Sequence, residues 1–297
     1  MRITKTAMIT IAGRPNVGKS TLTNRLVGEK VAIVSHKPQT TRNRICGIVN
    51  REDTQFIFVD TPGYHQPRTK LGDYMVRVTK QSVFDVDAVL LMVEPIANIG
   101  AQEAALLQQL KACGEPVILV INKIDSAEKA SLLAVIAVYS QAMEFAAVVP
   151  ISAKTGEGME ALLSECGKFA AEGPQLFPDG MTSDQPERQV MAEIIREKLL
   201  WCLEREVPHG TAVEITRFSE RDDGIIDLEA TIYCEKPNHK GIIIGKQGAT
   251  LKKISTLARE DCERFMGTKI YLQTWVKVKE NWRDSDFLVR NFGYRDT

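Results

Sequence analysis

Short apolar runs alternate with amphipathic helical patterns through about the first 170 residues. The apolar runs fall at residues 7–12, 56–59, 88–93, 117–121 and 147–151, and each has the length of a buried strand. Between them, residues 20–26, 102–110 and 132–143 carry apolar side chains at three- and four-residue spacing, which predicts helices. The alternation predicts an α/β domain, with a mostly parallel sheet and helices on both faces.

The pattern changes after residue 172. Residues 172–180 contain two prolines and two glycines and interrupt the alternation, as a linker does. Beyond them we expect a helix at 187–205, strands at 211–218 and 225–234, a helical turn ending near 244, a helix at 248–265 and a strand at 269–279. The chain therefore divides into a first domain at 1–172, a linker at 173–186 and an α+β domain at 187–297 with the order α-β-β-α-α-β.

Charge and cysteine content narrow the class of protein. Lysine plus arginine and aspartate plus glutamate both number 38 among 297 residues, so no net charge steers the whole chain toward a partner. Residues 240–297 are locally basic, with 12 positive against 7 negative side chains, which suits an anionic partner. The six cysteines form no C-x-x-C pair, and no apolar run is long enough to span a bilayer. We expect a soluble, cytoplasmic protein with reduced thiols.

A phosphate-binding loop follows the first predicted strand. Residues 13–20 read G-R-P-N-V-G-K-S and lie between that strand and a helix, where backbone N–H groups and the helix N-terminus converge on an anion. Lys19 can reach the outer phosphates, and the Ser20 hydroxyl can bind Mg²⁺. The sequence therefore predicts a nucleoside triphosphate site.

Polar motifs at the ends of later strands indicate which nucleotide binds. D-T-P-G at residues 60–63 places Asp60 to hold Mg²⁺ and the backbone of Gly63 to meet the γ-phosphate. N-K-I-D at residues 122–125 places a carboxylate, Asp125, opposite the paired donor edge of guanine, so GTP is expected rather than ATP. S-A-K at residues 152–154 can close over the base. The combined set resembles that of the translation-factor-like GTPases.

That resemblance implies a switch and a mode of hydrolysis. A threonine in the mobile segment 37–42 would bind Mg²⁺ only while the γ-phosphate is present; the family pattern favours Thr41, and Thr40 stays an alternative. Ras-type GTPases carry a water-orienting glutamine where this chain has Tyr64, so slow hydrolysis is expected. Asn16 resembles the residue that binds K⁺ in some members of this class; the alternative is a residue that stabilises its own turn.

The predicted site residues are as follows. Lys19, Thr41, Asp60 and Gly63 are the predicted catalytic residues, and Ser20, Thr41 and Asp60 are the predicted metal ligands. The predicted nucleotide-binding residues are Gly13, Arg14, Pro15, Asn16, Val17, Gly18, Lys19, Ser20, Thr21, Asp60, Thr61, Pro62, Gly63, Tyr64, Asn122, Lys123, Ile124, Asp125, Ser152, Ala153 and Lys154.

A second glycine loop lies in the C-terminal domain. G-K-Q-G at residues 245–248 has the form of the G-x-x-G loop of a KH domain, in which two glycines let the backbone approach nucleic-acid phosphates. Together with the element order, it predicts a type II KH domain. The predicted RNA-binding residues are Gly241, Ile244, Gly245, Lys246, Gln247, Gly248, Lys252 and Lys253. We expect Trp275 to be a core residue of the last strand.

From end to end the chain resembles the Era family of bacterial ribosome-assembly GTPases. Residues 39–42, 193–198 and 275–279, with Trp282 and Asn16, carry the resemblance beyond the common GTPase motifs. It implies GTP/GDP and Mg²⁺ as ligands, binding of small-subunit ribosomal RNA near its 3′ end, and a role in 30S assembly, with GTP favouring the RNA-bound form. It also implies peripheral association with the inner face of the cytoplasmic membrane, and we expect a monomer.

Two other classes of protein share some of these features. Asp125 argues against a P-loop ATPase or small-molecule kinase, because a carboxylate has no donor pair to meet on adenine. A membrane-associated signalling GTPase whose C-terminal domain binds protein or lipid stays an alternative. RNase-sensitive association with ribosomal particles distinguishes that alternative from the ribosome-assembly interpretation.

Overall fold

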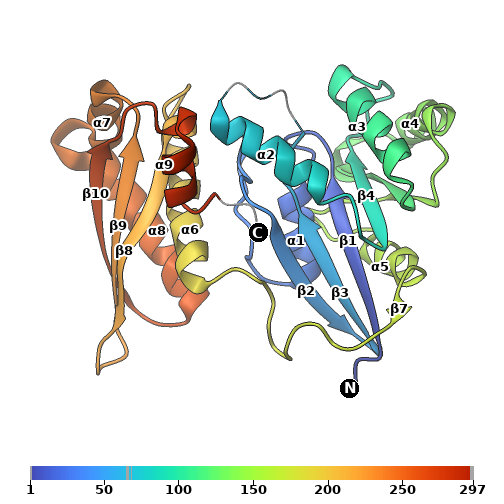
Figure 1. Cartoon of the computed structure of the whole chain (residues 1–297), viewed down its shortest axis with the longest axis horizontal. Coiled ribbons are helices and arrows are strands. Elements are labelled where there is room, and N and C mark those ends of the chain that lie inside the picture. The colour runs from blue at the N-terminus through green and yellow to red at the C-terminus, as the bar shows by residue number, and fades with distance from the viewer. Residues whose placement is uncertain (1, 65–66, 68, 295–297) are drawn as a thin grey trace. The chain divides into compact units, whose positions relative to one another are not determined.

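A computed structural model describes residues 2–64, 67 and 69–294 (Figure 1). Their contacts divide the chain into two compact units. Of the described residues, the first unit contains 2–32, 41–64 and 75–184, and the second contains 33–40, 67, 69–74 and 185–294. Two short segments from the N-terminal half of the sequence therefore belong to the second unit.

The sheet of the first unit has the strand order β2-β3-β1-β4-β5-β6, and β7 pairs with Lys5 and Thr6 at the start of β1. The strands β1, β3, β4, β5 and β6 run parallel, whereas β2 is antiparallel to β3 and β7 is antiparallel to β1. Their bounds are β1 Lys5–Ala12, β2 Ile45–Arg51, β3 Thr54–Asp60, β4 Ala88–Val93, β5 Val117–Ile121, β6 Ala147–Pro150 and β7 Ala171–Glu172.

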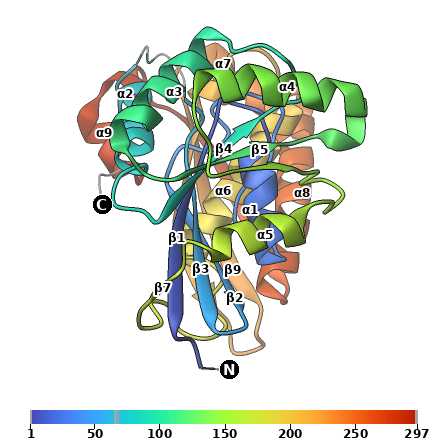
Figure 2. The same cartoon turned by 90° about the vertical axis from the view of Figure 1, so that its right-hand side faces the viewer.

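Helices cover both faces of this sheet (Figure 2). On one face, Leu22 of α1 and Leu162 of α5 pack against inward side chains of the central strands. On the other face, Leu106 of α3 and Tyr139 of α4 pack against the alternate side chains of β4 and β5. The bounds are α1 Lys19–Val27, α2 Lys70–Gln81, α3 Ala101–Cys113, α4 Lys129–Ala142 and α5 Met159–Gly167. The predicted α/β architecture is confirmed.

Residues 173–184 run along the first unit rather than away from it. The side-chain amide of Gln55 accepts hydrogen bonds from the backbone N–H groups of Leu176 and Phe177, at 2.9 and 2.8 Å. Farther on, Ser183 forms a β-bridge with Gly47, and the N–H of Ile48 donates to the carbonyl of Thr182 at 2.9 Å. The segment therefore covers the outer edge of β2.

The second unit is built on a three-stranded sheet of order β10-β9-β8, in which β9 is antiparallel to β8 and parallel to β10. The element order α6-β8-β9-α7-α8-β10 is the predicted one, followed by a short helix, α9. The bounds are α6 Glu187–Cys202, β8 Ala212–Glu220, β9 Ile226–Cys234, α7 Pro237–Ile244, α8 Ala249–Met266, β10 Ile270–Val278 and α9 Asp286–Asn291. The predicted α+β fold is confirmed.

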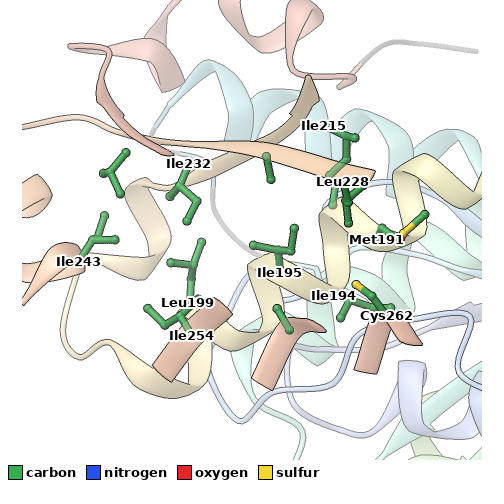
Figure 3. Packing of buried hydrophobic residues seen from close by; sticks show 14 of the residues in the cluster. Met191, Ile194, Ile195, Leu199, Ile215, Leu228, Ile232, Ile243, Ile254 and Cys262 are labelled. Carbon is green, nitrogen blue, oxygen red and sulfur yellow. The ribbon is translucent and has the colours of Figure 1, made fainter. Parts of the chain in front are cut away.

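The core of the second unit lies between its sheet and helices (Figure 3). Ile195 and Leu199 of α6 point toward side chains of the sheet, and Ile194 lies beside Cys262 of α8. Helix α8 contributes Ile254, Ala258 and Cys262, which recur every four residues and so share one face. These residues are buried on both sides of the interface, so α6 is an integral part of this core.

The prediction that Trp275 is a core residue is wrong. Its side chain is 56 % exposed, whereas Ile270 and Val276 of the same strand are buried. Successive residues of a strand face opposite sides of the sheet, and Trp275 takes the parity of Tyr271, which also faces solvent. The buried tryptophan is Trp282, whose indole N–H donates to the carbonyl of Gly210 at 2.9 Å.

Across the residues that the structure describes, no helix is both long and apolar enough to cross a membrane. All six cysteines are free thiols in the structure. Burial raises the pKa of Cys46 and of Cys166 to about 12, so both thiols are protonated at neutral pH.

Candidate nucleotide and RNA sites

The polar motifs of the first unit meet at one edge of its sheet. The phosphate loop follows β1, Asp60 ends β3, Asn122 follows β5 and Ser152 follows β6. Because these strands are parallel, their carboxyl ends lie at the same edge, where ligands bind in open α/β sheets. The predicted nucleotide residues are thus brought together by topology.

Two glycines, one in the phosphate loop and one that packs against it, leave no room for a side chain. Gly18 has φ +104°, and a Cβ there would lie 2.3 Å from the Asn122 side-chain nitrogen. Gly63 lies so close to the loop that its Cβ would be 2.8 Å from Cα of Pro15. The ammonium of Lys19 donates to the carbonyls of Gly13 and Arg14, both at 3.2 Å. The loop is therefore closed around a buried cation, ready for an anion.

Three predicted metal ligands form one cluster. The Ser20 hydroxyl donates to Oδ2 of Asp60 at 2.7 Å and lies 2.8 Å from Oγ1 of Thr41. Thr40, the alternative, turns away and donates to the carbonyl of Lys37 at 2.7 Å. The second carboxylate oxygen of Asp60 is buried and has no hydrogen-bond partner among the described residues. Two hydroxyls and a carboxylate with an unused oxygen fit a hard divalent cation such as Mg²⁺.

Burial sets the protonation of this cluster. Removal from water raises the pKa of Asp60 to about 6, although Lys19 and the Ser20 hydroxyl oppose that rise. Burial also lowers the pKa of Lys19 to about 8, with Asp60 acting in the opposite direction. Each charged form is costly without a ligand, so a bound cation at Asp60 and a phosphate at Lys19 would both relieve the site.

The guanine-recognition motif is held by hydrogen bonds between loops. The Ser152 hydroxyl donates to Oδ1 of Asp125 at 2.7 Å and so orients the carboxylate. Asn122 donates to the carbonyl of Val17 at 2.7 Å and accepts from the N–H of Ala153 at 2.9 Å. Asn122 therefore ties the phosphate loop to the S-A-K loop and positions both beside the predicted nucleotide site.

Two acidic residues that sequence reasoning missed support the same loops. One oxygen of Glu94 accepts from the Arg14 guanidinium and the other from the Lys123 ammonium. Arg14 also pairs with Glu103 at 2.8 Å, and Lys123 donates to the carbonyl of Asn16 at 2.8 Å. Glu94 directly follows β4, at the same sheet edge as the other site residues. That position is the signal that could have identified it.

Tyr64 lies at the start of the segment after D-T-P-G. Its N–H donates to the carbonyl of Gly13 at 3.2 Å, and its ring packs against the core cluster of α3 and α4. A packed phenol ring lacks the amide with which glutamine orients a water molecule in Ras-type sites.

The second glycine loop joins α7 to α8. Gly245 and Gly248 have φ of +73° and +78°, and Gln247 between them has φ +51°. A Cβ at Gly245 would lie 2.2 Å from Oγ1 of Thr250, whereas a Cβ at Gly248 meets open space. The loop ends at the N-terminus of α8, whose backbone N–H groups favour an anion.

Cationic side chains flank this loop. Lys246, Lys252 and Lys253 are exposed, and Ile244 is half-buried next to the fully buried Ile243. The predicted RNA-binding residues therefore lie together, with positive charge beside a backbone turn.

Comparison with known proteins agrees with this geometry. Residues 8–123 match the family model described as a 50S ribosome-binding GTPase, and residues 206–283 match the KH domain model. The GTPase Era of Ruminiclostridium cellulolyticum is 51 % identical over 291 residues, which cover 98 % of each chain. The GTPase Era of Clostridium kluyveri is 52 % identical, over 98 % of this chain and 99 % of that protein.

The chain belongs to the Era family of GTPases.

Two solved Era structures match nearly the whole fold. A complex of Era with MgGDPNP and nucleotides 1506–1542 of 16S ribosomal RNA has a TM-score of 0.94 and 38 % identity, covering 99 % of this chain and all of that one. A tyrosine variant of Aquifex aeolicus Era bound to GDP·AlF₄⁻ has a TM-score of 0.94 and 39 % identity, covering 98 % and 100 %. This Era-family chain is thus a GTPase followed by a KH domain.

Proposed function

We propose that this chain binds Mg²⁺·GTP at the sheet edge of the first unit and small-subunit ribosomal RNA, near its 3′ end, through the KH loop. It would act in 30S subunit assembly, with the nucleotide state controlling its association with RNA. Support for the RNA comes from the related Era complex, which contains nucleotides 1506–1542 of 16S ribosomal RNA. The membership of the chain in the Era family supports the role in assembly.

The cluster of Ser20, Thr41 and Asp60 carries the nucleotide half of the proposal. Bound Mg²⁺ neutralises charge on the β- and γ-phosphate oxygens. Ser20 and Asp60 are the residues that would hold it, and Thr41 would join them. Lys19 would donate to phosphate oxygens in place of the loop carbonyls, and the backbone N–H of Gly63 would donate to the γ-phosphate. Asp125, oriented by Ser152, accepts hydrogen bonds from guanine.

We expect hydrolysis to be slow, because Tyr64 offers no amide to the attacking water. K⁺ bound near Asn16 would add positive charge at the phosphates. Replacement of K⁺ by Na⁺ should then lower kcat; an equal kcat in the two salts would exclude a K⁺ requirement.

Three parts of the proposal remain. A cytoplasmic location is expected from the cysteine pattern, a monomeric state is expected, and peripheral association with the cytoplasmic membrane is what the family resemblance implies. Sedimentation velocity measures the oligomeric state, and flotation with vesicles of anionic phospholipid measures membrane association.

Crosslinking to total RNA tests the RNA half directly. The wild-type protein should enrich the 3′ end of small-subunit ribosomal RNA, more with GDPNP than with GDP. Gly245→Asp should abolish enrichment, because the new side chain meets Thr250 and adds a negative charge where a phosphate would lie. Gly180→Asp, at an exposed glycine that also has a positive φ and open space for a Cβ, adds the same charge before α6 and should leave enrichment unchanged. Equal enrichment by wild type and Gly245→Asp would refute the KH-loop assignment.

A further inference from the structure

Residues 33–40, which precede the proposed metal ligand Thr41, belong to the second unit and lie along α6. Val34 is held at both of its backbone groups. Its N–H donates to Oε1 of Glu197 at 2.8 Å, and its carbonyl accepts from the indole N–H of Trp201 at 3.0 Å. The start of the segment is therefore fixed to consecutive turns of α6.

The remainder of the segment is fixed in the same way. The Lys37 ammonium donates to the carbonyl of Leu203, just beyond the C-terminus of α6. The Arg196 guanidinium donates to the carbonyl of Thr40. Arg196 is fully buried and is itself held by Glu193, with Nε–Oε1 at 2.8 Å and Nη2–Oε2 at 2.5 Å. An arginine with its guanidinium oriented in this way gives the Thr40 carbonyl one defined position.

A buried ion network lies behind these contacts. The Lys198 ammonium is 2.7 Å from Oε2 of Glu197 and 2.6 Å from Oδ2 of Asp261 on α8, and it lies 3.6 Å from the centre of the Trp201 ring. Both Glu197 and Lys198 are about 1 % exposed. Buried charges are costly unless they are paired with good geometry, so this network holds Glu197 and Trp201 in place.

The sequence motif of residues 193–198 therefore has a physical role that the common GTPase motifs do not cover. Arg196 binds the carbonyl of the peptide that joins Thr40 to Thr41, and a peptide is planar, so its orientation also sets the direction of the chain at Thr41. At this peptide the chain passes from the second unit to the first. The Thr41 hydroxyl then lies beside Ser20.

We propose that Arg196, Glu197 and Trp201 of α6 are positioning residues of the GTPase site, which hold residues 33–40 so that Thr41 can bind Mg²⁺·GTP. This inference rests on the proposed role of Thr41 as a GTP-dependent metal ligand. The inference makes α6 the conformational link between the nucleotide and the second unit. Helix α6 is part of the core of that unit and also holds residues 33–40. Linkage is reciprocal: if GTP raises the affinity for RNA through α6, RNA raises the affinity for GTP by the same factor.

The test compares GDPNP with GDP, because a threonine that binds only with the γ-phosphate affects the first alone. In Arg196→Met, the dissociation constant for GDPNP should rise about tenfold, the effect of one lost charge-assisted hydrogen bond, while that for GDP should change less than about twofold. Trp201→Phe removes the indole donor to Val34 and keeps an aromatic ring beside Lys198, and it should raise the GDPNP constant about threefold.

Two variants on the same helix control for folding and charge. Arg196→Lys keeps a donor for the Thr40 carbonyl and should recover most of the GDPNP affinity. Arg188→Met removes an exposed arginine of α6 and should leave both constants unchanged. Fluorescence titration with labelled nucleotides gives both constants, and circular dichroism confirms that each variant is folded.

The outcomes separate this inference from the proposed function. Equal weakening of GDPNP and GDP, or no change in Trp201→Phe and Arg196→Met, would overturn the positioning role. If wild type shows no preference for RNA in the GDPNP state, the proposed RNA switch fails, whereas the GDPNP-to-GDP ratio still decides the role of α6. If Thr41→Ala binds GDPNP and GDP with wild-type affinity, the assumed metal role of Thr41 fails and the inference with it.

Discussion

Glu94→Gln is expected to weaken GDP and GTP binding by the same factor. The Glu94 carboxylate takes the Arg14 guanidinium on one oxygen and the Lys123 ammonium on the other. It thereby joins the phosphate loop to the guanine loop at the end of β4. Neither side chain is among the predicted contacts of the γ-phosphate or its Mg²⁺, whereas Thr41 and Gly63 are. Loss of the carboxylate should therefore not distinguish the two nucleotides.

The size of the effect follows from what each partner retains. Glutamine keeps one oxygen, so one charge-assisted hydrogen bond is lost outright and the other loses its charge. Arg14 keeps Glu103 at 2.8 Å, and Lys123 keeps the carbonyl of Asn16 at 2.8 Å, so neither cation is left bare. One partly exposed charge-assisted bond contributes about 1.5 kcal/mol, which corresponds to about a tenfold rise in both dissociation constants.

Titration with fluorescent GDP and GDPNP measures both constants. Glu160→Gln is the matched control, because Glu160 pairs with Arg51 on the surface of the same unit and is 78 % exposed. Exposed pairs contribute little, so its constants should equal those of wild type. Wild-type affinity in Glu94→Gln, or an effect confined to GDPNP, would refute the argument that Glu94 preorganises both loops.

Three further predictions concern nucleotide choice, pH and thiol reactivity. Asp125→Asn should lose GTP affinity by at least about a hundredfold and gain affinity for xanthosine triphosphate, because an amide can donate to the carbonyl that replaces the guanine amino group. Competition binding measures both affinities, and unchanged GTP affinity would exclude Asp125 from base recognition. Apparent Mg²⁺·GDP affinity should peak between the pKa of Asp60 at about 6 and that of Lys19 at about 8. Below pH 6 a proton on Asp60 competes with the cation, and above pH 8 Lys19 loses its charge. Isothermal titration calorimetry from about pH 5 to about pH 9 measures the affinity, and a flat profile would contradict the prediction. Cys46 and Cys166 should react with a thiol reagent only as fast as the protein unfolds, because both thiols are buried and protonated. Rapid labelling of either thiol in the native protein would contradict this and show that the core opens locally.

The pH argument also has a consequence for stability. A carboxyl whose pKa rises from 3.8 to about 6 on folding binds its proton more tightly in the folded state. It therefore contributes stability below pH 3.8, and that contribution is lost as the pH rises through about 6. The nucleotide-free protein carries this cost at neutral pH.

Strand order explains why so much of the nucleotide site could be predicted from sequence. Each motif follows an apolar run, and parallel strands bring such residues to one edge whatever the intervening loops do. The same rule selects Glu94, the first polar residue after β4, although no four-letter motif marks it. The choice between Thr40 and Thr41 is different in kind. Both are neighbouring threonines in one loop, and only the contacts of Ser20 and Arg196 separate them.

Several features of the structure were not predicted, for different reasons. The edge strand β2 mixes apolar residues with Gly47 and polar residues at its end, so its alternation is weak. Helix α2 was not predicted either, although Leu71, Met75 and Val78 lie at helical spacing and that pattern is strong enough to indicate a helix despite Gly72. The exposure of Trp275 depends on the parity of β10, which a short amphipathic run specifies only once its partner strand is known. The role of residues 33–40 depends on α6, about 160 positions away in the sequence.

The course of residues 173–184 along β2 matters for any attempt to divide the protein. An unpaired edge strand offers free N–H and C=O groups to a strand of another chain. A fragment that stops at residue 172 would bare the edge that Thr182 and Ser183 now pair, and it should self-associate at high concentration. A fragment that continues to residue 184 carries its own cover and should stay dispersed. The apparent linker is thus a guard against aggregation as much as a connection.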